Sequence, residues 1–480
     1  MKKYLWSIFL SGLSIASFAQ NFNGIAHSTS AGIHNVYTNP ALIAGSKYGL
    51  HINLFAGNAN VYNNYADWVG PYKLNRLIFG GIPQQYLRPD GRPALQPEYF
   101  RENLDGRPKN GTGTSEVRGP GILIGLGRKQ SIAITTRARA SVQAFGVSEN
   151  LLSLVRQGID FATLWNITNV DNKFSINGNI YGEVALTYGA TMIEAGPHTL
   201  KGGITAKKIV GFYSAHIRNR GLNYRVVEDP ERPGRGLFVM DHFDADFGYT
   251  SQEPINDGVG LRKFLGQKMP GSGWGFDLGF AYEYNAQEDE SGRYNIRLSA
   301  SIMDVGTVRY EDPSQIKGYT ILRSDKTIRQ EDFDNVRGSD ELVQLIESKM
   351  DLQPSEAKTS FVTGLPMALN TNADVRLGEE VFVNVSYIRD LRSVNVLSAR
   401  QPTVFSVTPR WESASGLEIA VPLNWMFNTF SPGVAMRLGP VFAGTDNMVG
   451  LFSNSRRIAA RGMDVYAGLS LPLFKRKPRY

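Results

Sequence analysis

Strict alternation between apolar and other residues is the feature that most limits what this chain can become. The stretch RGMDVYAGLSLPLF near the C-terminus has an apolar residue at every second position from Met463 to Leu473. Asp464, Tyr466, Gly468 and Ser470 lie between them. A period of two is typical of a strand with one face in an apolar medium and the other in a different one. Because a soluble sheet can satisfy this pattern too, the choice depends on whether the rest of the chain repeats it.

The same alternation recurs from Tyr48 onward, and its connections are alternately short and long. The short connections fall at 127–130, 194–198, 286–292, 377–380, 412–416 and 439–440. The long ones run over 57–120, 146–173, 214–272, 305–359, 390–402, 424–432 and 446–461. We therefore predict an all-β fold, a transmembrane antiparallel up-and-down β-barrel of about 14 strands with long extracellular loops. Closure of the ring leaves no unpaired strand edge in lipid.

A soluble β-sandwich or propeller is the alternative that the alternation alone leaves open. It does not explain the regular succession of short and long connections. It also does not explain charged residues on the supposed inner face of nearly every strand, because unpaired charges are costly in a packed soluble core. The connections and the charged inner face therefore favour the barrel over the soluble alternatives.

The chain divides into four parts. Residues 1–19 carry two lysines, an apolar stretch and a Ser-Phe-Ala cleavage site, which predicts a secretory signal peptide. Residues 20–47 are small and polar and predict a periplasmic or plug segment, 48–474 the barrel, and 475–480 a basic periplasmic tail. Localisation is expected to be the cell outer membrane with both termini periplasmic. The absence of cysteine rules out a disulfide scaffold and an acylated lipoprotein.

Charged side chains on the non-lipid face are the candidate lumen lining. Arg137 and Arg139 stand two positions apart on one face of a strand, which suits a wet lumen. The candidate lumen or ligand residues are Arg137, Arg139, Gln143, Glu183, Lys207, Asp277, Glu283, Arg297, Asp374 and Arg376. Arg410, Glu418 and Asp464 fall on the same predicted face. Both signs are present, which suits ion-paired rigidity as well as transit and does not predict selectivity for one sign of ion.

Two stretches in the long connections have alternative interpretations. MDHFDADFGY gathers Asp241, His242, Asp244 and Asp246 in a predicted external loop, where alternate oxygen ligands suit Ca²⁺. The glycine and distal glutamate of an EF-hand loop are missing, so a solvated acidic loop is preferred. GSDELVQLIESKM predicts a short amphipathic helix, either packing over the barrel mouth or acting as a lid or docking surface.

Three stretches together resemble a known family. GWGFDLGFAYEYN with YNIRLSASIMDVGTVRY, GPVFAGTDNMVGLF and RGMDVYAGLSLPL resemble the DUF5723-type outer-membrane β-barrels of Bacteroidetes. These are similar in appearance to the long-chain fatty-acid channel (FadL-like) and to type IX secretion barrels. Asn39, Pro40 and Ala41 resemble the NPA stretch of the fatty-acid channel family, where it belongs to an N-terminal plug. The resemblance implies a plug motif at these three residues; by themselves they predict a turn.

Two classes of function follow. The first is passive passage of small amphipathic or hydrophobic molecules across the outer membrane, which the fatty-acid channel resemblance implies. The second is a non-transporting structural or docking barrel for an envelope or type IX secretion-linked partner. The six scattered histidines show no helical metal-binding spacing. We expect no catalytic residues, metal or cofactor. The expected partners are outer-membrane lipid, a small hydrophobic ligand or an envelope protein, and no nucleic acid.

Overall fold

The computed structural model describes residues 22–251, 269–286, 294–312, 314–334, 336, 339–393, 396–453, 458 and 460–475. The predicted signal peptide lies outside the described residues. So does the predicted basic tail, apart from Lys475. The structure therefore begins at the segment that was predicted as a plug.

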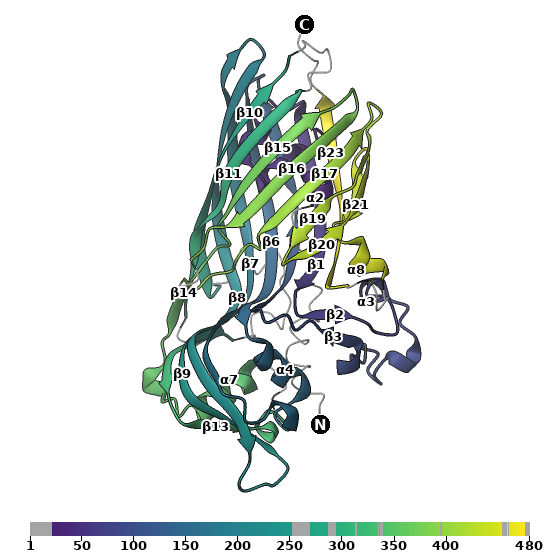
Figure 1. Cartoon of the computed structure of the whole chain (residues 1–480). Helices are drawn as coiled ribbons and strands as arrows, with labels where there is room; N and C mark the ends of the chain where they lie inside the picture. The colour runs from purple at the N-terminus through teal and green to yellow at the C-terminus, as the bar shows by residue number, and fades with distance from the viewer. Residues whose placement is uncertain are drawn as a thin grey trace.

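A ring of 14 antiparallel strands forms the body of the molecule and confirms the predicted fold class (Figure 1). Four ring strands are interrupted and carry two labels each. In ring order the strands are β1 (Tyr48–Asn63), β4 (Lys109–Arg118) with β5 (Gly121–Leu126), β6 (Gln130–Val147), β7 (Asn169–Ala195), β8 (His198–Glu228), β10 (Gly271–Tyr284), β11 (Ile296–Glu311), β14 (Ser360–Gly364) with β15 (Ala368–Arg376), β16 (Val381–Asp390), β17 (Val404–Glu412), β18 (Leu417–Ala420) with β19 (Leu423–Met426), β20 (Thr429–Pro432) with β21 (Val434–Leu438), β22 (Val441–Thr445) and β23 (Gly462–Lys475).

The first and last strands close the ring. β1 pairs with β23 from Tyr48 opposite Lys475 to Tyr62 opposite Gly462. The alternation of β23 is as expected: Asp464 and Tyr466 are buried towards the lumen, whereas Leu469 and Leu473 are exposed on the outer wall. Outward residues on the other strands, such as Phe276, Leu278 and Phe280 of β10, are also large and exposed. The wall therefore presents an apolar belt to its surroundings.

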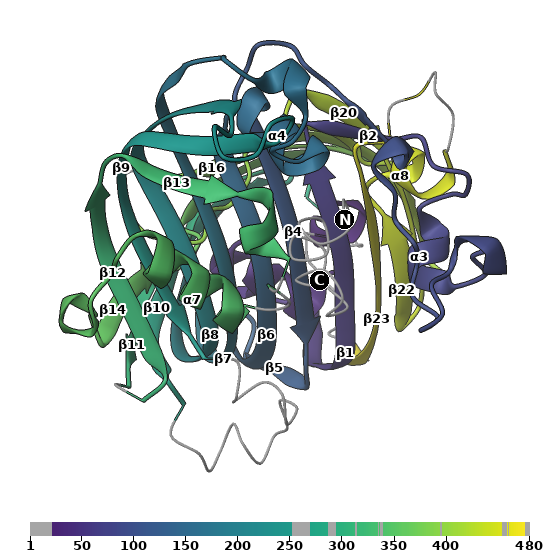
Figure 2. The ribbon, with the colours of Figure 1, turned by 90° about the horizontal axis from the view of Figure 1, so that it is seen from below.

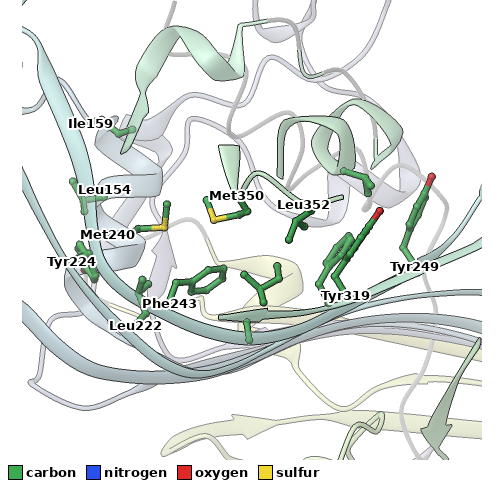
Figure 3. Packing of buried hydrophobic residues seen from close by; sticks show 14 of the residues in the cluster. Leu154, Ile159, Leu222, Tyr224, Met240, Phe243, Tyr249, Tyr319, Met350 and Leu352 are labelled. Carbon is green, nitrogen blue, oxygen red and sulfur yellow. The ribbon is translucent and has the colours of Figure 1, made fainter. Parts of the chain in front are cut away.

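A second sheet extends beyond the ring on the side of the long connections. Here the distal part of β8 pairs with β9 (Gly236–Thr250), which also pairs with β12 (Ile316–Arg323) and β13 (Lys326–Arg329). We call this the external sheet. The helices α4 (Glu149–Gln157) and α7 (Ser339–Lys349) cover it, and Figure 3 shows the apolar core between them, including Met240, Phe243 and Met350. The helix predicted from GSDELVQLIESKM is thus confirmed, and it packs on this sheet.

The external sheet corrects two sequence predictions. MDHFDADFGY is part of strand β9 and not a loop. Its acidic side chains are ion-paired: Asp241 Oδ1 lies 2.6 Å from Arg225 Nη1, and both Asp244 and Asp246 contact Arg220. His242, on the same strand, lies opposite Asn223 of β8. The long connections 214–272 and 305–359 therefore carry ordered strands, because a hydrophobic core outside the ring supports them.

Another predicted long connection, 424–432, is a tight hairpin turn. β19 and β20 pair up to Met426 opposite Thr429, so only Phe427 and Asn428 form the turn. Both have positive φ, 49° and 57°, as a two-residue turn of this kind requires. The strands are simply longer than their alternation indicated.

The first and last long connections form a smaller module beside the ring. It comprises the two-stranded sheet of β2 (Ala66–Trp68) and β3 (Phe100–Glu102), with the short helices α3 (Asn75–Phe79) and α8 (Met448–Phe452). Trp68 and Tyr72 form its buried centre. Short 3₁₀ turns complete the long connections at Gln84–Tyr86, Pro97–Tyr99, Ala162–Leu164, Gln330–Phe333 and Pro354–Glu356. No helix within the described ranges combines the length and the apolar character needed to cross a membrane.

Candidate functional site: a plug seated in the barrel lumen

Residues 22–47, the plug segment, lie inside the ring of strands (Figure 2). They form α2 (Asn23–Ala26) and the 3₁₀ helices η1 (Gly32–Tyr37) and η2 (Pro40–Ile43) before the chain enters β1. Phe22, Ile25, Ile33 and Ile43 are at most 1% exposed. Burial this complete occurs because the segment fills the space that the wall encloses.

The NPA turn is docked against the wall through Asn39. The Asn39 side chain accepts a hydrogen bond from the backbone N–H of Ala41 at 2.9 Å, which starts η2. Its amide Nδ2 donates to the carbonyl oxygens of Phe280 and Ala300, at 3.0 and 3.1 Å. One side chain therefore joins the plug to two neighbouring wall strands.

Glycines make this docking possible. Gly203 of β8 and Gly279 of β10 lie directly opposite each other in the sheet, and a Cβ on either would overlap the plug. The added atom would lie 2.3 Å from the carbonyl carbon of Pro40 at Gly203, and 2.0 Å from Asn39 Oδ1 at Gly279. Glycine is the residue that lets two backbones approach this closely. We call Gly203 and Gly279 the glycine seat.

A first ion cluster lies in the lumen beside the plug. It combines four cations with four carboxylates, all buried except the partly buried Arg139: Arg118, Arg137, Arg139 and Lys207 with Glu116, Glu183, Asp277 and Asp304. Lys207 Nζ lies 2.8 Å from Asp277 Oδ1, and Arg137 Nε lies 2.6 Å from Glu183 Oε1. Buried charges are tolerated in this way only when they are paired and hydrogen-bonded.

Arg118 connects the first ion cluster to the plug. Its guanidinium carbon lies 3.9 Å from the centre of the Phe22 ring and 4.0 Å from that of the Tyr37 ring. Such cation–π contacts are stronger when both groups are desolvated, as they are here. The cluster thus holds both ends of the α2–η1 portion of the plug.

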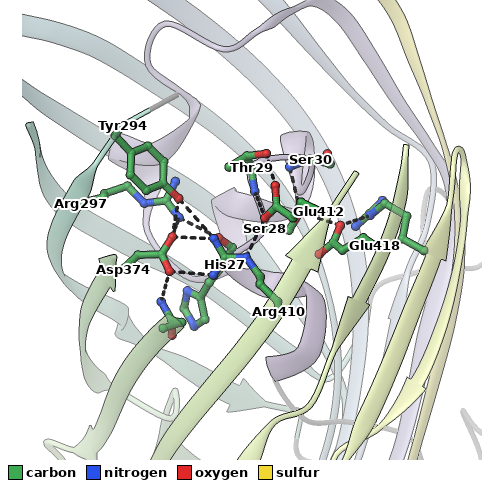
Figure 4. Close-up of polar contacts among 12 residues, drawn as sticks. His27, Ser28, Thr29, Ser30, Tyr294, Arg297, Asp374, Arg410, Glu412 and Glu418 are labelled. Carbon is green, nitrogen blue, oxygen red and sulfur yellow. Dashed lines mark hydrogen bonds and ion pairs between the residues drawn. The ribbon is translucent and has the colours of Figure 1, made fainter. Parts of the chain in front are cut away.

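A second ion cluster forms hydrogen bonds with backbone and hydroxyl groups of the plug segment (Figure 4). Arg410 makes two 2.7 Å contacts to Asp374 and a 2.6 Å contact to Glu412. The plug completes the cluster, because Glu412 accepts a hydrogen bond from Thr29 N at 3.1 Å. Arg297 also donates to the His27 carbonyl oxygen at 2.8 Å.

His27 is held as a neutral ring in this environment. Burial lowers the pKa of His27 to about 3, the main effect opposing protonation. The ring nitrogen Nδ1 lies 3.2 Å from the amide Nδ2 of Asn372, so it can accept a hydrogen bond from the wall. His27 therefore keeps its contact with Asn372 throughout the neutral pH range.

The predicted lumen residues separate into three groups. Arg137, Arg139, Glu183, Lys207 and Asp277 lie in the first ion cluster, and Arg297 and Asp374 in the second. Gln143 donates to the Arg400 carbonyl oxygen at 2.6 Å, and Glu283 pairs with Lys201 at 2.6 Å. Arg376 belongs to neither cluster; it donates to the Gly378 carbonyl at 2.9 Å and so closes the turn after β15.

Four charged members of the two ion clusters were missed from the sequence, and one of them is Arg118, which like Glu116 fell in a predicted long connection. Glu116 was assigned to a long connection, although β4 carries it along the wall. Glu412 was assigned to a turn, although it ends β17. Asp304 should face outward by alternation from Arg297, but β11 bulges against β10 and Asp304 has a φ of 57°, which turns its side chain inward. Continuing the alternation along the chain could have placed Glu116 and Glu412 on strands. The bulge at Asp304 has no clear signal in the sequence.

Two carboxylates in the lumen lack the cationic partners of the others. Asp446 and Asp464 are at most 1% exposed, and neither forms an ion pair within the described residues. Asp446 N donates to Asp464 Oδ1 at 2.5 Å, and Asp446 accepts hydrogen bonds from Asn23 N and the Tyr466 hydroxyl, both at 3.1 Å. The start of the plug therefore rests on a pair of adjacent acids.

We expect Asp464→Asn to raise the free energy of unfolding by about 1–3 kcal/mol at neutral pH. The amide keeps an oxygen for the Asp446 N–H and removes the repulsion that arises whenever both adjacent acids ionise. Denaturant unfolding of the refolded protein measures this. Asp374→Asn is the matched control, since Asp374 is equally buried but paired with Arg410, and it should lower the same quantity. A loss of stability in both variants would contradict the prediction.

Two hollows meet at the junction of β11 and β15. A small internal cavity lies between the plug and the wall, lined by His27, Asn39 and Asn372 among others. On the outer wall an apolar groove of about 450 Å³ is lined by Phe280, Leu298 and Tyr387 together with small residues. Ser299, Thr371 and Asn372 line both hollows. The strands remain paired between them, so the wall here is one backbone thick.

The fold and the lumen together define a plugged β-barrel with an apolar outer wall and a polar, ion-paired interior. The chain belongs to DUF5723, described as a family of unknown function, whose sequence pattern matches residues 40–446. No curated protein matches the chain. Within the described residues no group of three or more histidine, aspartate or glutamate side chains is placed to hold a metal ion.

Several solved barrels resemble the chain at low similarity. The toluene transporter TbuX of Ralstonia pickettii is 10% identical with a TM-score of 0.38, covering 95% of this chain and 98% of that one. The translocator domain of the autotransporter NalP from Neisseria meningitidis is 8% identical with a TM-score of 0.32, covering 88% of each. A Pseudomonas aeruginosa FadL homologue is 11% identical with a TM-score of 0.29, covering 98% and 95%. Likeness at this level assigns no function to the chain.

Proposed function

We propose that the protein is an outer-membrane channel for small amphipathic or hydrophobic molecules, closed at rest by its plug segment. The apolar belt suits lipid, and the polar lumen is that of a barrel wide enough to hold a plug. Both termini of the barrel lie at its short-turn end, which we assign to the periplasmic side. The external sheet then lies outside the cell.

The observation that carries this proposal is the placement of the two hollows. The internal cavity is bounded partly by the plug, so movement of the plug would enlarge it. The outer groove beside it is apolar and opens towards lipid. Apolar surroundings with a few polar groups are what a small amphipathic ligand needs. A molecule that reached the cavity would be separated from the groove only by the β11–β15 pairing.

Removing the plug tests the proposal directly. A variant lacking residues 22–47 is expected to give discrete current steps in planar bilayers, whereas the full barrel stays silent. The wall is held by its own hydrogen bonds and should still fold, which heat-modifiable migration checks. Silence of both forms, with the fold retained, would contradict a channel role.

A docking role is the second candidate, and the external sheet favours it. A hydrophobic core outside the membrane ring, with Tyr224, Met240 and Phe243 at its centre, orders the long connections into a fixed surface. A sealed lumen with ion-paired walls also suits a rigid platform. Silence of both forms in the bilayer measurement, together with stable binding of an envelope protein to the external sheet, would support this role.

A further inference from the structure

The smaller module carries large apolar side chains on its surface, although it also has a well-buried hydrophobic core. Phe79 of α3 is 72% exposed, and Met448 and Phe452 of α8 are 38% and 51% exposed. The core of the module is formed by Trp68 and Tyr72, which are 2% exposed. The exposed residues therefore do not reflect loose packing of the module. We call Phe79, Met448 and Phe452 the apolar shelf.

The apolar shelf lies where the barrel wall ends. α3 and α8 contact each other, and α8 also contacts β20 and β23. Figures 1 and 2 agree that both helices lie outside the ring of strands, beside its long-connection end. Placed there, the module projects sideways over the surroundings of the wall and does not cover the lumen.

The shelf is continuous with the apolar belt. Phe430 of β20 and Val434 of β21 are exposed on the outer wall, 49% and 37%. β20 contacts α8, and Val434 pairs with Thr445, three residues before α8 begins. The same medium that covers the belt can therefore cover the shelf without a break.

Basic residues flank the shelf. Lys73 precedes α3 and Arg76 lies within it; both are exposed, and neither has an ion-pair partner in the part of the chain that the structure describes. Aromatic residues at the level of the headgroups, with lysine or arginine reaching phosphates, are typical of membrane interfaces.

We propose that the apolar shelf inserts into the lipid leaflet on the long-connection side, and that Lys73 and Arg76 bind the headgroup phosphates of its anionic lipids. The proposal rests on the membrane location given above. It makes the module a second membrane contact beside the strands, which would fix the height and tilt of the barrel in the bilayer.

Single cysteine variants test the insertion, because the chain has no cysteine of its own. A nitroxide label on Phe79→Cys is examined in vesicles of phosphatidylcholine and phosphatidylglycerol, with oxygen and a water-soluble nickel complex as relaxing agents. Leu278→Cys on the outer wall is the lipid reference, and Leu322→Cys on the external sheet, 62% exposed, is the water reference. We expect Phe79→Cys to favour oxygen, as Leu278→Cys does.

The other outcomes have distinct meanings. A Phe79→Cys label that behaves like Leu322→Cys, beside a lipid-exposed Leu278→Cys, would overturn the insertion alone. A water-exposed Leu278→Cys would overturn the membrane location and this proposal with it. Dipolar broadening between Phe79→Cys labels would indicate that a second copy of the chain covers the shelf, and would also overturn it.

The phosphate contact is tested by Lys73→Gln with Arg76→Gln in the Phe79→Cys background. In vesicles that contain phosphatidylglycerol we expect the label to shift towards the water reference, and in pure phosphatidylcholine we expect a smaller shift. An equal shift in both vesicles would overturn the role of the two basic residues as ligands of anionic lipid. Neither residue touches the plug or the lumen, so the fold of the barrel should be unchanged.

Discussion

Current steps are expected in planar bilayers when Gly203→Ala and Gly279→Ala are combined in the full-length barrel. Each methyl group would occupy space that the plug now fills, 2.3 Å from the carbonyl carbon of Pro40 and 2.0 Å from Asn39 Oδ1. Overpacking of this kind costs about 1–3 kcal/mol per site. The wall strands are hydrogen-bonded on both sides, so the plug is the part that can move away.

The substitutions should leave the wall intact. Neither glycine has a positive φ, so alanine adds only its methyl group and no backbone strain. Gly178→Ala on β7 is the matched control, because a Cβ there would have its nearest atoms at 3.9 Å. We expect the control to stay silent. A folded double variant that also stays silent would contradict the idea that the glycine seat retains the plug.

The ring could be predicted from the sequence because lipid and lumen impose one period on every strand. β23 illustrates this, since its outward Leu469 and inward Asp464 follow from counting in twos. The same counting predicted that Arg137 and Arg139 share the inner face. Glu183 of β7 lies directly opposite Arg137 in the neighbouring strand. Asp304 of β11 comes from a strand distant in the sequence, so alternation could place the arginines but could not pair them with Asp304.

The external sheet could not be predicted, because its strands lose their period. β8 and β9 shift register between Asn219 and Gly221, and again between Asn223 and Tyr224. Each bulge moves the following side chains to the other face. In β9 the buried Met240 and Phe243 are therefore three positions apart, whereas the buried Phe243, Ala245, Phe247 and Tyr249 alternate, so no single alternation describes the whole strand.

The role of the glycine seat also could not be predicted from the sequence. The NPA turn was expected to belong to a plug, and the structure places it inside the ring of strands. Gly203 and Gly279, however, belong to strands more than 160 residues further along the chain. Glycine in a strand can mark a bulge, a bend or a close backbone contact, and only the docked plug distinguishes these.

The largest loss of stability is expected from Arg410→Met. Arg410 is 3% exposed and neutralises both Asp374 and Glu412. Its removal leaves two buried carboxylates with weaker partners, since Arg297 reaches Asp374 only at 3.4 Å. Breaking a buried pair from one side costs about 3–5 kcal/mol. Urea unfolding in lipid vesicles measures the change in the free energy of unfolding.

Two further variants separate the charge from the packing. Arg309→Met removes one partner of an exposed pair, Arg309 with Glu311, and should cost no more than about 1 kcal/mol. Arg410→Met combined with Asp374→Asn removes both charges of the main pair and should be less destabilised than Arg410→Met alone, because no unpaired Asp374 remains. Equal stability of the single and double variants would mean that packing, and not the unpaired charge, dominates. The plug would then be held chiefly by its shape, and its release should respond more to the glycine seat than to the ion clusters.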